Sequence, residues 1–115
     1  MNQSALVRLV LPDVRELLHE AKKEDIARAL RPFHAADVAE LVERLEDGDA
    51  ATLVGALPEG KRAEVFEQLE TPQCARLVNL LGPEVLAPTI VRMASDDRAD
   101  LVSALPPEVG QKLLA

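Results

Sequence analysis

Alanine recurs every twelve residues along most of this chain, and this periodicity restricts the possible folds more than any other feature. The alanines are Ala27, Ala39, Ala51, Ala63, Ala75, Ala87 and Ala99. Large apolar residues two and three places after the alanines from Ala39 onward, and six places after every alanine, keep the same step, and only Thr89 interrupts the first of these columns. Because self-similarity at a fixed period is typical of repeat architectures, the chain is predicted to be an array of similar structural units.

A single long helix cannot bury this pattern. Twelve helical residues at roughly 100° each turn the apolar stripe by about 120° per repeat, so each unit must be a short helix followed by a turn. Thr71 and Ser95 are expected N-caps, whereas Pro72, Pro83 and Pro107 suit the first turn of a helix. The predicted regular helices lie at about 35–45, 48–57, 60–69, 72–81, 83–93, 96–105 and 107–114, and Pro88 is expected to kink or delay the fifth of these.

The N-terminal part fits the repeat only loosely. Pro12 and Asp13 are expected to start a helix that runs to about Lys22, and a second helix is expected from Lys23 to Leu30. Helices this short are marginal alone in water, so they must stack on their neighbours. The sequence therefore predicts an all-α solenoid in a single domain, 1–115, with capping helices in 1–33 and regular repeats in 34–115.

Composition excludes several classes of function. The net charge of −7 argues against a nucleic-acid partner, and the chain has neither Tyr nor Trp on which bases could stack. No apolar run approaches the length of a membrane span, and Cys74, in the apolar register, has no second cysteine to pair with. A soluble domain in a reducing, cytoplasmic setting is expected.

Candidate catalytic and zinc-binding groups are scarce. His19 and His34 have no second nitrogen or sulfur ligand at usable spacing, and the glycines form no phosphate-binding loop. No serine or cysteine belongs to a recognisable nucleophile arrangement. We therefore predict that the chain is not an enzyme.

Acidic residues are concentrated in one third of the chain. Residues 37–70 carry ten carboxylates and three basic side chains, which accounts for the whole net charge. One position after the alanine, the chain carries the acidic residues Glu40, Glu64 and Asp100. This position is predicted to point away from the core, so that these carboxylates form an acidic ridge. The ridge has two interpretations, a solvated face that keeps the array soluble and a surface that attracts cations.

Several stretches resemble the N-terminal intracellular domain of MgtE-type magnesium transporters. The resemblance covers about residues 14–115 and rests on the order and spacing of four segments, 30–41 (LRPFHAADVAEL), 57–58 (LP), 63–69 (AEVFEQL) and 95–101 (SDDRADL). The sequence departs from the pattern at Ala35, where proline is common, and at Pro88. The middle domain of the flagellar motor switch protein FliG is built similarly, which leaves open a helical protein–protein adaptor without a metal role.

The resemblance implies a right-handed superhelix that regulates a magnesium channel at the cytoplasmic face of the inner membrane. Its partners would be tandem CBS domains and the membrane channel, in a full-length protein that is a dimer. Family members share Mg²⁺ between carboxylates of this domain and of the CBS domains, and Glu64 and Asp96 match such ligands best, with Asp97 and Asp100 beside them. Mg²⁺ prefers oxygen ligands and keeps several waters, so facing carboxylates can hold it weakly and favour a closed state.

Each of these residues also has an interpretation without metal. Asp96 and Asp97 are well placed to interact with a helix N-terminus, and Glu64 is within reach of Lys61 or Arg62 on its own helix. A domain that is only a structural relic is the third alternative, after the sensor and the adaptor.

Overall fold

The computed structural model describes residues 3–20 and 22–114, and the side chains of 10–20 and 22–113. Residues 1, 2 and 21, which belong to the predicted capping segment, and residue 115 lie outside this description. All regular structure in the described ranges is helical. The helices are α1 (Gln3–Glu20), α2 (Lys23–Leu30), α3 (Ala35–Arg44), α4 (Asp47–Ala56), α5 (Glu59–Gln68), α6 (Thr71–Leu81), α7 (Pro83–Val91), α8 (Ser95–Ala104) and α9 (Pro107–Leu114).

The twelve-residue step of the sequence is also the step of the structure. From α2 to α9, each helix begins twelve residues after the one before it, starting at Lys23 and ending at Pro107. Pro72, Pro83 and Pro107 lie in the first turns of their helices, as predicted. The periodic array of short helices is therefore confirmed.

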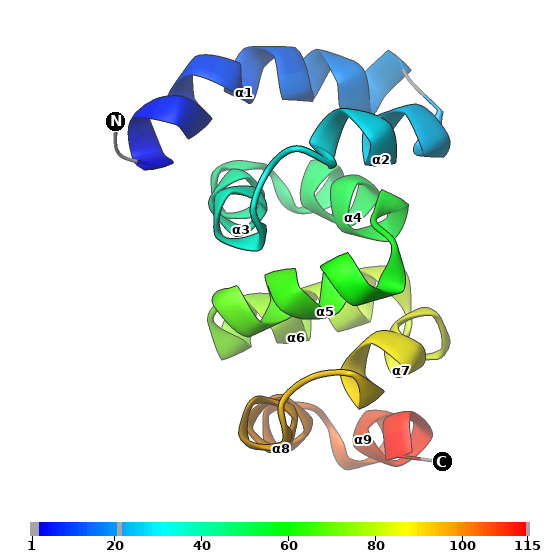
Figure 1. The fold of residues 1–115 in the computed structure, drawn as a ribbon. Helices are drawn as coiled ribbons and strands as arrows, with labels where there is room; N and C mark the ends of the chain where they lie inside the picture. Colours follow the sequence, from blue (N-terminus) through cyan, green and yellow to red (C-terminus); the bar gives the residue numbers. More distant parts are fainter. Residues whose placement is uncertain (1–2, 21, 115) are drawn as a thin grey trace.

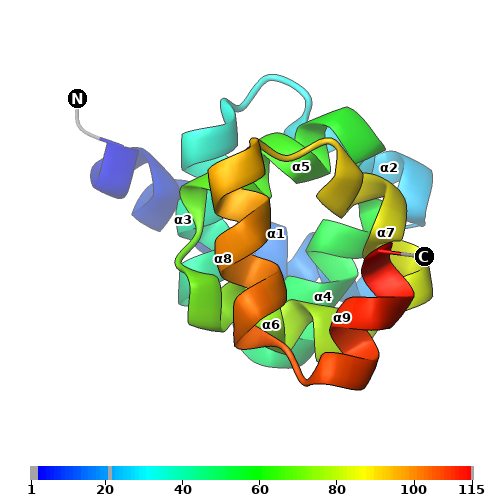
Figure 2. The same ribbon diagram turned by 90° about the horizontal axis from the view of Figure 1, so that it is seen from below.

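The helices pack mainly on their second neighbours along the chain. In one row α3 contacts α5, α5 contacts α7, and α7 contacts α9. In the other row α4 contacts α6, and α6 contacts α8. Figure 1 shows the resulting stack, with α1 and α2 at one end and α8 and α9 at the other, so the chain ends lie far apart. Seen along the stack in Figure 2, the helices turn about the direction of stacking. The right-handed sense of the winding stays a prediction.

The apolar columns of the repeat form one continuous core. Side chains two and three places after each alanine are almost all buried, and Leu41, Leu53, Val65 and Val78 have no exposed surface. Cys74 is buried as well, as its register predicts. Because neighbouring columns interdigitate along the whole stack, no helix buries its apolar face alone.

Arg62 occupies a buried column that holds apolar residues in most other helices. Its guanidinium group donates hydrogen bonds to the carbonyl oxygens of Val54, Gly55 and Leu57 at the end of α4, at 2.8–3.2 Å. It also donates to Oγ1 of Thr89 at 3.3 Å. Thr89 interrupts the apolar column two places after the alanines, so two of the exceptions to the repeat are hydrogen-bonded to each other. Burial lowers the pKa of Arg62, and the nearby charge of Glu59 opposes that shift.

Two predictions about the N-terminal helix and the caps are wrong. α1 runs through Pro12 instead of starting there, because its packing on α3 and α4 offsets the hydrogen bond that proline cannot donate and the steric clash of the proline ring. Thr71 and Ser95 are the first residues of their helices, preceded by the N-cap residues Glu70 and Ala94, and neither cap makes a side-chain hydrogen bond.

The helix that contains Pro88 begins at Pro83, so the proline does not delay it. Pro88 falls in the sixth position, and the helix ends at Val91, two residues before the predicted end. The N–H groups of Arg92 and Met93 close the last turn on the carbonyls of Thr89 and Ile90. This tight turn brings the chain directly to the start of α8.

Candidate metal-binding surface

Three of the four predicted ligands lie on the first turns of α8. Asp96 and Asp97 are its second and third residues, and Asp100 follows one turn later. Asp96 and Asp100 are exposed, whereas Asp97 is half-buried. The unpaired N–H groups at a helix start favour negative charge there, so the helix itself supports Asp96 and Asp97.

Glu67, in the last turn of α5, lies close to these aspartates although it is not among the ligands predicted from the sequence. Its Oε2 atom accepts a hydrogen bond of 2.6 Å from the backbone N–H of Ala94, the residue before α8. The bond fixes the end of α5 against the start of α8, which lies 27 residues further along the chain. The only sequence signal was its spacing of three residues from Glu64, and the contact with α8 required the fold.

The electrostatics agree with this grouping of carboxylates. The pKa of Asp97 is raised above its ordinary value, first by desolvation and then by the charges of Asp96, Glu67 and Asp100. Asp97 in turn acts on Cys74 of α6, where burial and the Asp97 charge raise the thiol pKa to about 12. Asp97 therefore lies between the acidic group and the buried face of α6. We call Glu67, Asp96, Asp97 and Asp100 the acidic seam.

Glu64, the fourth predicted ligand, is exposed on α5 one turn before Glu67. It is not among the charges that shift the pKa of Asp97. Neither of its proposed partners is in contact with it, since Lys61 donates to the carbonyl oxygen of Phe33 and the guanidinium group of Arg62 is buried. Within the described side chains Glu64 has no ion pair, and its carboxylate faces solvent.

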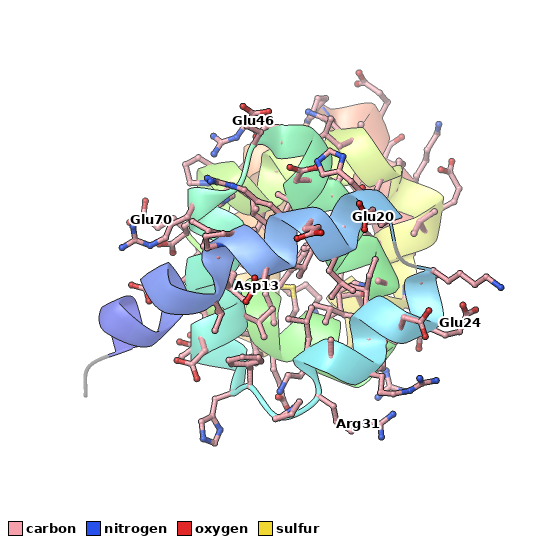
Figure 3. All side chains as sticks on the ribbon, turned by 90° about the horizontal axis from the view of Figure 1, so that it is seen from above. Asp13, Glu20, Glu24, Arg31, Glu46 and Glu70 are labelled. Atoms are coloured by element: carbon pink, nitrogen blue, oxygen red, sulfur yellow. The ribbon has the colours of Figure 1, made fainter. Side chains whose placement is uncertain are left out.

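Other carboxylates of the acidic third behave differently. Asp37 is 5% exposed and its Oδ1 atom has no hydrogen-bond partner within the described residues. Glu40, predicted to share the outer ridge with Glu64 and Asp100, is half-buried and lies 3.9 Å from Arg44. In Figure 3, Glu46 and Glu70, which precede α4 and α6, point outward at the rim. The predicted ridge is thus interrupted at Glu40.

No group of three or more His, Cys, Asp or Glu side chains within the described residues is arranged to hold a metal ion by itself. His19 contacts Asp49 through Nε2 at 3.2 Å, far along the chain from the acidic seam. The seam offers oxygen ligands from two helices, which suits a hydrated Mg²⁺ that takes its remaining ligands from water or from a second surface.

Comparison with known proteins identifies a family. Residues 33–115 match the model of a family described as the MgtE intracellular N domain. A search of curated proteins finds no match. In the part of the chain that the structure describes, none of the helices combines the length and apolar character needed to cross a bilayer. The matched range contains α3 to α9 and every residue of the acidic seam.

Proposed function

The chain belongs to the MgtE intracellular N domain family, a regulatory domain of magnesium transporters, and we propose that it senses Mg²⁺ through the acidic seam together with Glu64. In this proposal, Mg²⁺ bridges these carboxylates to carboxylates of CBS domains in the same transporter, on the cytoplasmic side of the membrane. Bridging favours the closed channel when Mg²⁺ is ample.

The observation that carries the proposal is the hydrogen bond from the N–H of Ala94 to Glu67, which holds the end of α5 beside the three aspartates at the start of α8. The pKa of Asp97 is raised there, first by desolvation and then by repulsion from the charges of Asp96, Glu67 and Asp100. A divalent cation would relieve that repulsion, and the set is too small to bind one tightly alone. Carboxylates of a second acidic surface would complete the Mg²⁺ site. Weak binding of this kind suits a sensor of an ion that is abundant in cells.

The two states follow from the charges. Without Mg²⁺, the acidic seam and an acidic partner surface repel each other, and with Mg²⁺ the ions hold them together. A ligand shifts such an equilibrium only by its differential affinity for the two states. Since screening limits exposed charges to about 8–10 Å at ordinary ionic strength, only carboxylates near the contact take part. The family match favours this sensor over the adaptor alternative.

The experiment is a flux measurement on a transporter that carries this domain, with Asp96→Ala and Glu64→Ala combined. Losing the bridging carboxylates should raise the Mg²⁺ concentration needed for closure by about tenfold or more, the size of a typical coupling between sites. Glu46→Ala removes another exposed carboxylate, one that points outward at the rim (Figure 3), and as the control it should leave closure unchanged. If both variants close as the wild type does, Asp96 and Glu64 have no part in the mechanism.

A further inference from the structure

A hollow beside α2 combines an apolar lining with two positive charges. It lies between the end of α2 and the junction of α4 with α5, and its volume is about 180 Å³. The residues that line it are Ala27, Leu30, Arg31, Leu57, Pro58 and Lys61. Since an apolar cavity of about 150 Å³ holds benzene, this hollow has room for one Leu or Phe side chain.

The two bases at the hollow have no acidic partner. Among the described side chains, neither Arg31 nor Lys61 belongs to an ion pair. The ammonium group of Lys61 donates to the carbonyl oxygen of Phe33, which fixes its position without neutralising its charge. In Figure 3, Arg31 lies at the rim where α2 ends. In a chain of net charge −7, the hollow therefore carries two uncompensated positive charges.

The repeat provides an internal comparison for these two positions. Arg31 is the only base in its repeat column, which continues as Glu43, Gly55, Glu67, Asn79, Val91 and Ser103. Lys61 is also the only base in its column, where α2, α3, α4 and α8 carry Asp25, Asp37, Asp49 and Asp97. The array thus packs its other helices without a base at either position. The two exceptions meet at one hollow, as expected of a binding site for a negatively charged ligand.

We propose that this hollow binds an acidic peptide segment of a partner protein. An apolar side chain of the segment enters the hollow, and carboxylates on either side of it contact Arg31 and Lys61. The guanidinium group can hold a carboxylate through two parallel hydrogen bonds, whereas the ammonium group acts as a point charge. Because the contact is small and exposed ion pairs contribute little each, the binding is weak.

This contact is separate from the acidic seam. Lys61 lies in the first turn of α5, whereas Glu67 lies in its last turn. The peptide supplies the negative charge itself, so its binding needs no Mg²⁺. A measurement in EDTA therefore tests this proposal without testing the magnesium sensor.

The test is an NMR titration of the isolated chain in EDTA with the peptide acetyl-Glu-Leu-Glu-Phe-Glu-amide. Shifts of the backbone amides should be confined to the end of α2 and the junction of α4 with α5. Arg31→Glu reverses one charge and Ala27→Leu fills the hollow. Each should weaken binding by about tenfold or more, equivalent to about 1.4 kcal/mol.

Lys22→Glu is the matched control, since Lys22 is an exposed base at the opposite end of α2. The eight residues of α2 span about 12 Å, more than the screening length of about 8 Å at physiological ionic strength. The dissociation constant of this variant should therefore stay within about twofold of the wild type. Because Arg31 is exposed as well, Arg31→Glu should leave the thermal unfolding midpoint within a few degrees of the wild type.

Four results would overturn the proposal. The first is a wild-type chain whose amides do not shift with millimolar peptide. The second is equal binding of a peptide with Ser in place of Leu and Phe, which would remove the hollow from the contact. The third is an Arg31→Glu variant that binds as tightly as the Lys22→Glu control. The fourth is binding to vesicles of phosphatidylserine and phosphatidylcholine without any response to the peptide, which would assign the two bases to a membrane surface.

Discussion

At the scale of single residues, Arg62 and Arg98 show that the repeat determines the position of a side chain in its helix but not how deeply that side chain is buried. They occupy the same column three repeats apart, and each donates to a backbone carbonyl at the end of the preceding helix, Gly55 for Arg62 and Val91 for Arg98. Arg62 is buried with three further hydrogen bonds, whereas Arg98 is half-exposed with one. The sequence showed the shared column, but the burial depends on α7 covering Arg62, which only the fold reveals.

This difference predicts unequal effects on stability. Arg62→Ala leaves buried carbonyls of α4 without a donor and should lower the free energy of unfolding by about 2–4 kcal/mol. Arg98→Ala, the matched control, should lower it by about 1 kcal/mol or less because water replaces the lost donor. Urea denaturation followed by circular dichroism measures both. Equal losses for the two variants would contradict the structural role assigned to Arg62.

Asp97 gives a prediction in the pH dependence of stability. In the unfolded chain its carboxyl titrates near its ordinary pKa of 3.8, and in the folded chain the pKa is higher. The folded state therefore binds more protons between these two values, so stability falls as the pH rises through this window. Asp97→Asn should raise the unfolding midpoint at pH 7 relative to wild type, and the gain should disappear at pH 3.

The matched control is Asp25→Asn, at the same position of α2. Asp25 lies 3.4 Å from Arg28, so its replacement should not stabilise the protein at pH 7. Thermal unfolding of the three proteins at both pH values gives the comparison. A stabilising effect of Asp97→Asn that is as large at pH 3 as at pH 7 would show that charge repulsion is not its cause.

At the scale of elements, the helices were predictable because their ends are marked locally. Prolines and glycines mark the starts of α5, α6, α7 and α9, and Ser95 followed by two aspartates marks the start of α8; the observed bounds of these helices differ from the expected ones by two residues or fewer. The start of α1 was missed because a proline inside a helix and a proline at its first turn look alike in sequence, and tertiary packing decides between them. The predicted side-chain caps are absent because Thr71 and Ser95 are the first helical residues, one place after the N-cap positions.

Gly82 is the one junction where backbone conformation restricts the residue type. It connects α6 to α7 with a φ of 95°, the only positive φ within the described residues. Gly82→Ala should destabilise the protein by about 1–2 kcal/mol, because a side chain disfavours this conformation. Gly60→Ala, inside α5 with open space around it, should instead stabilise by up to about 1 kcal/mol. Chemical denaturation measures both, and a Gly82→Ala variant as stable as Gly60→Ala would show that the junction tolerates a side chain.

At the scale of the whole molecule, the array and most of the candidate site could be predicted from the sequence for different reasons. The array was predictable because the twelve-residue period of alanine and apolar residues runs through most of the chain. Asp96, Asp97 and Asp100 could be grouped because they share one helix, and the resemblance to a family pointed to them. Glu67 could not be added, because its contact with Ala94 joins segments 27 residues apart that only the packing of α5 against α7 brings together.

The central claim is that the acidic seam is where this domain meets Mg²⁺. The most direct measurement is a titration of the isolated chain with MgCl₂, followed by the backbone amide resonances in NMR. The account predicts weak, about millimolar binding, with shifts confined to the end of α5 and the first turns of α8. A tight site of one Mg²⁺ per chain, or shifts that leave α8 untouched, would contradict it.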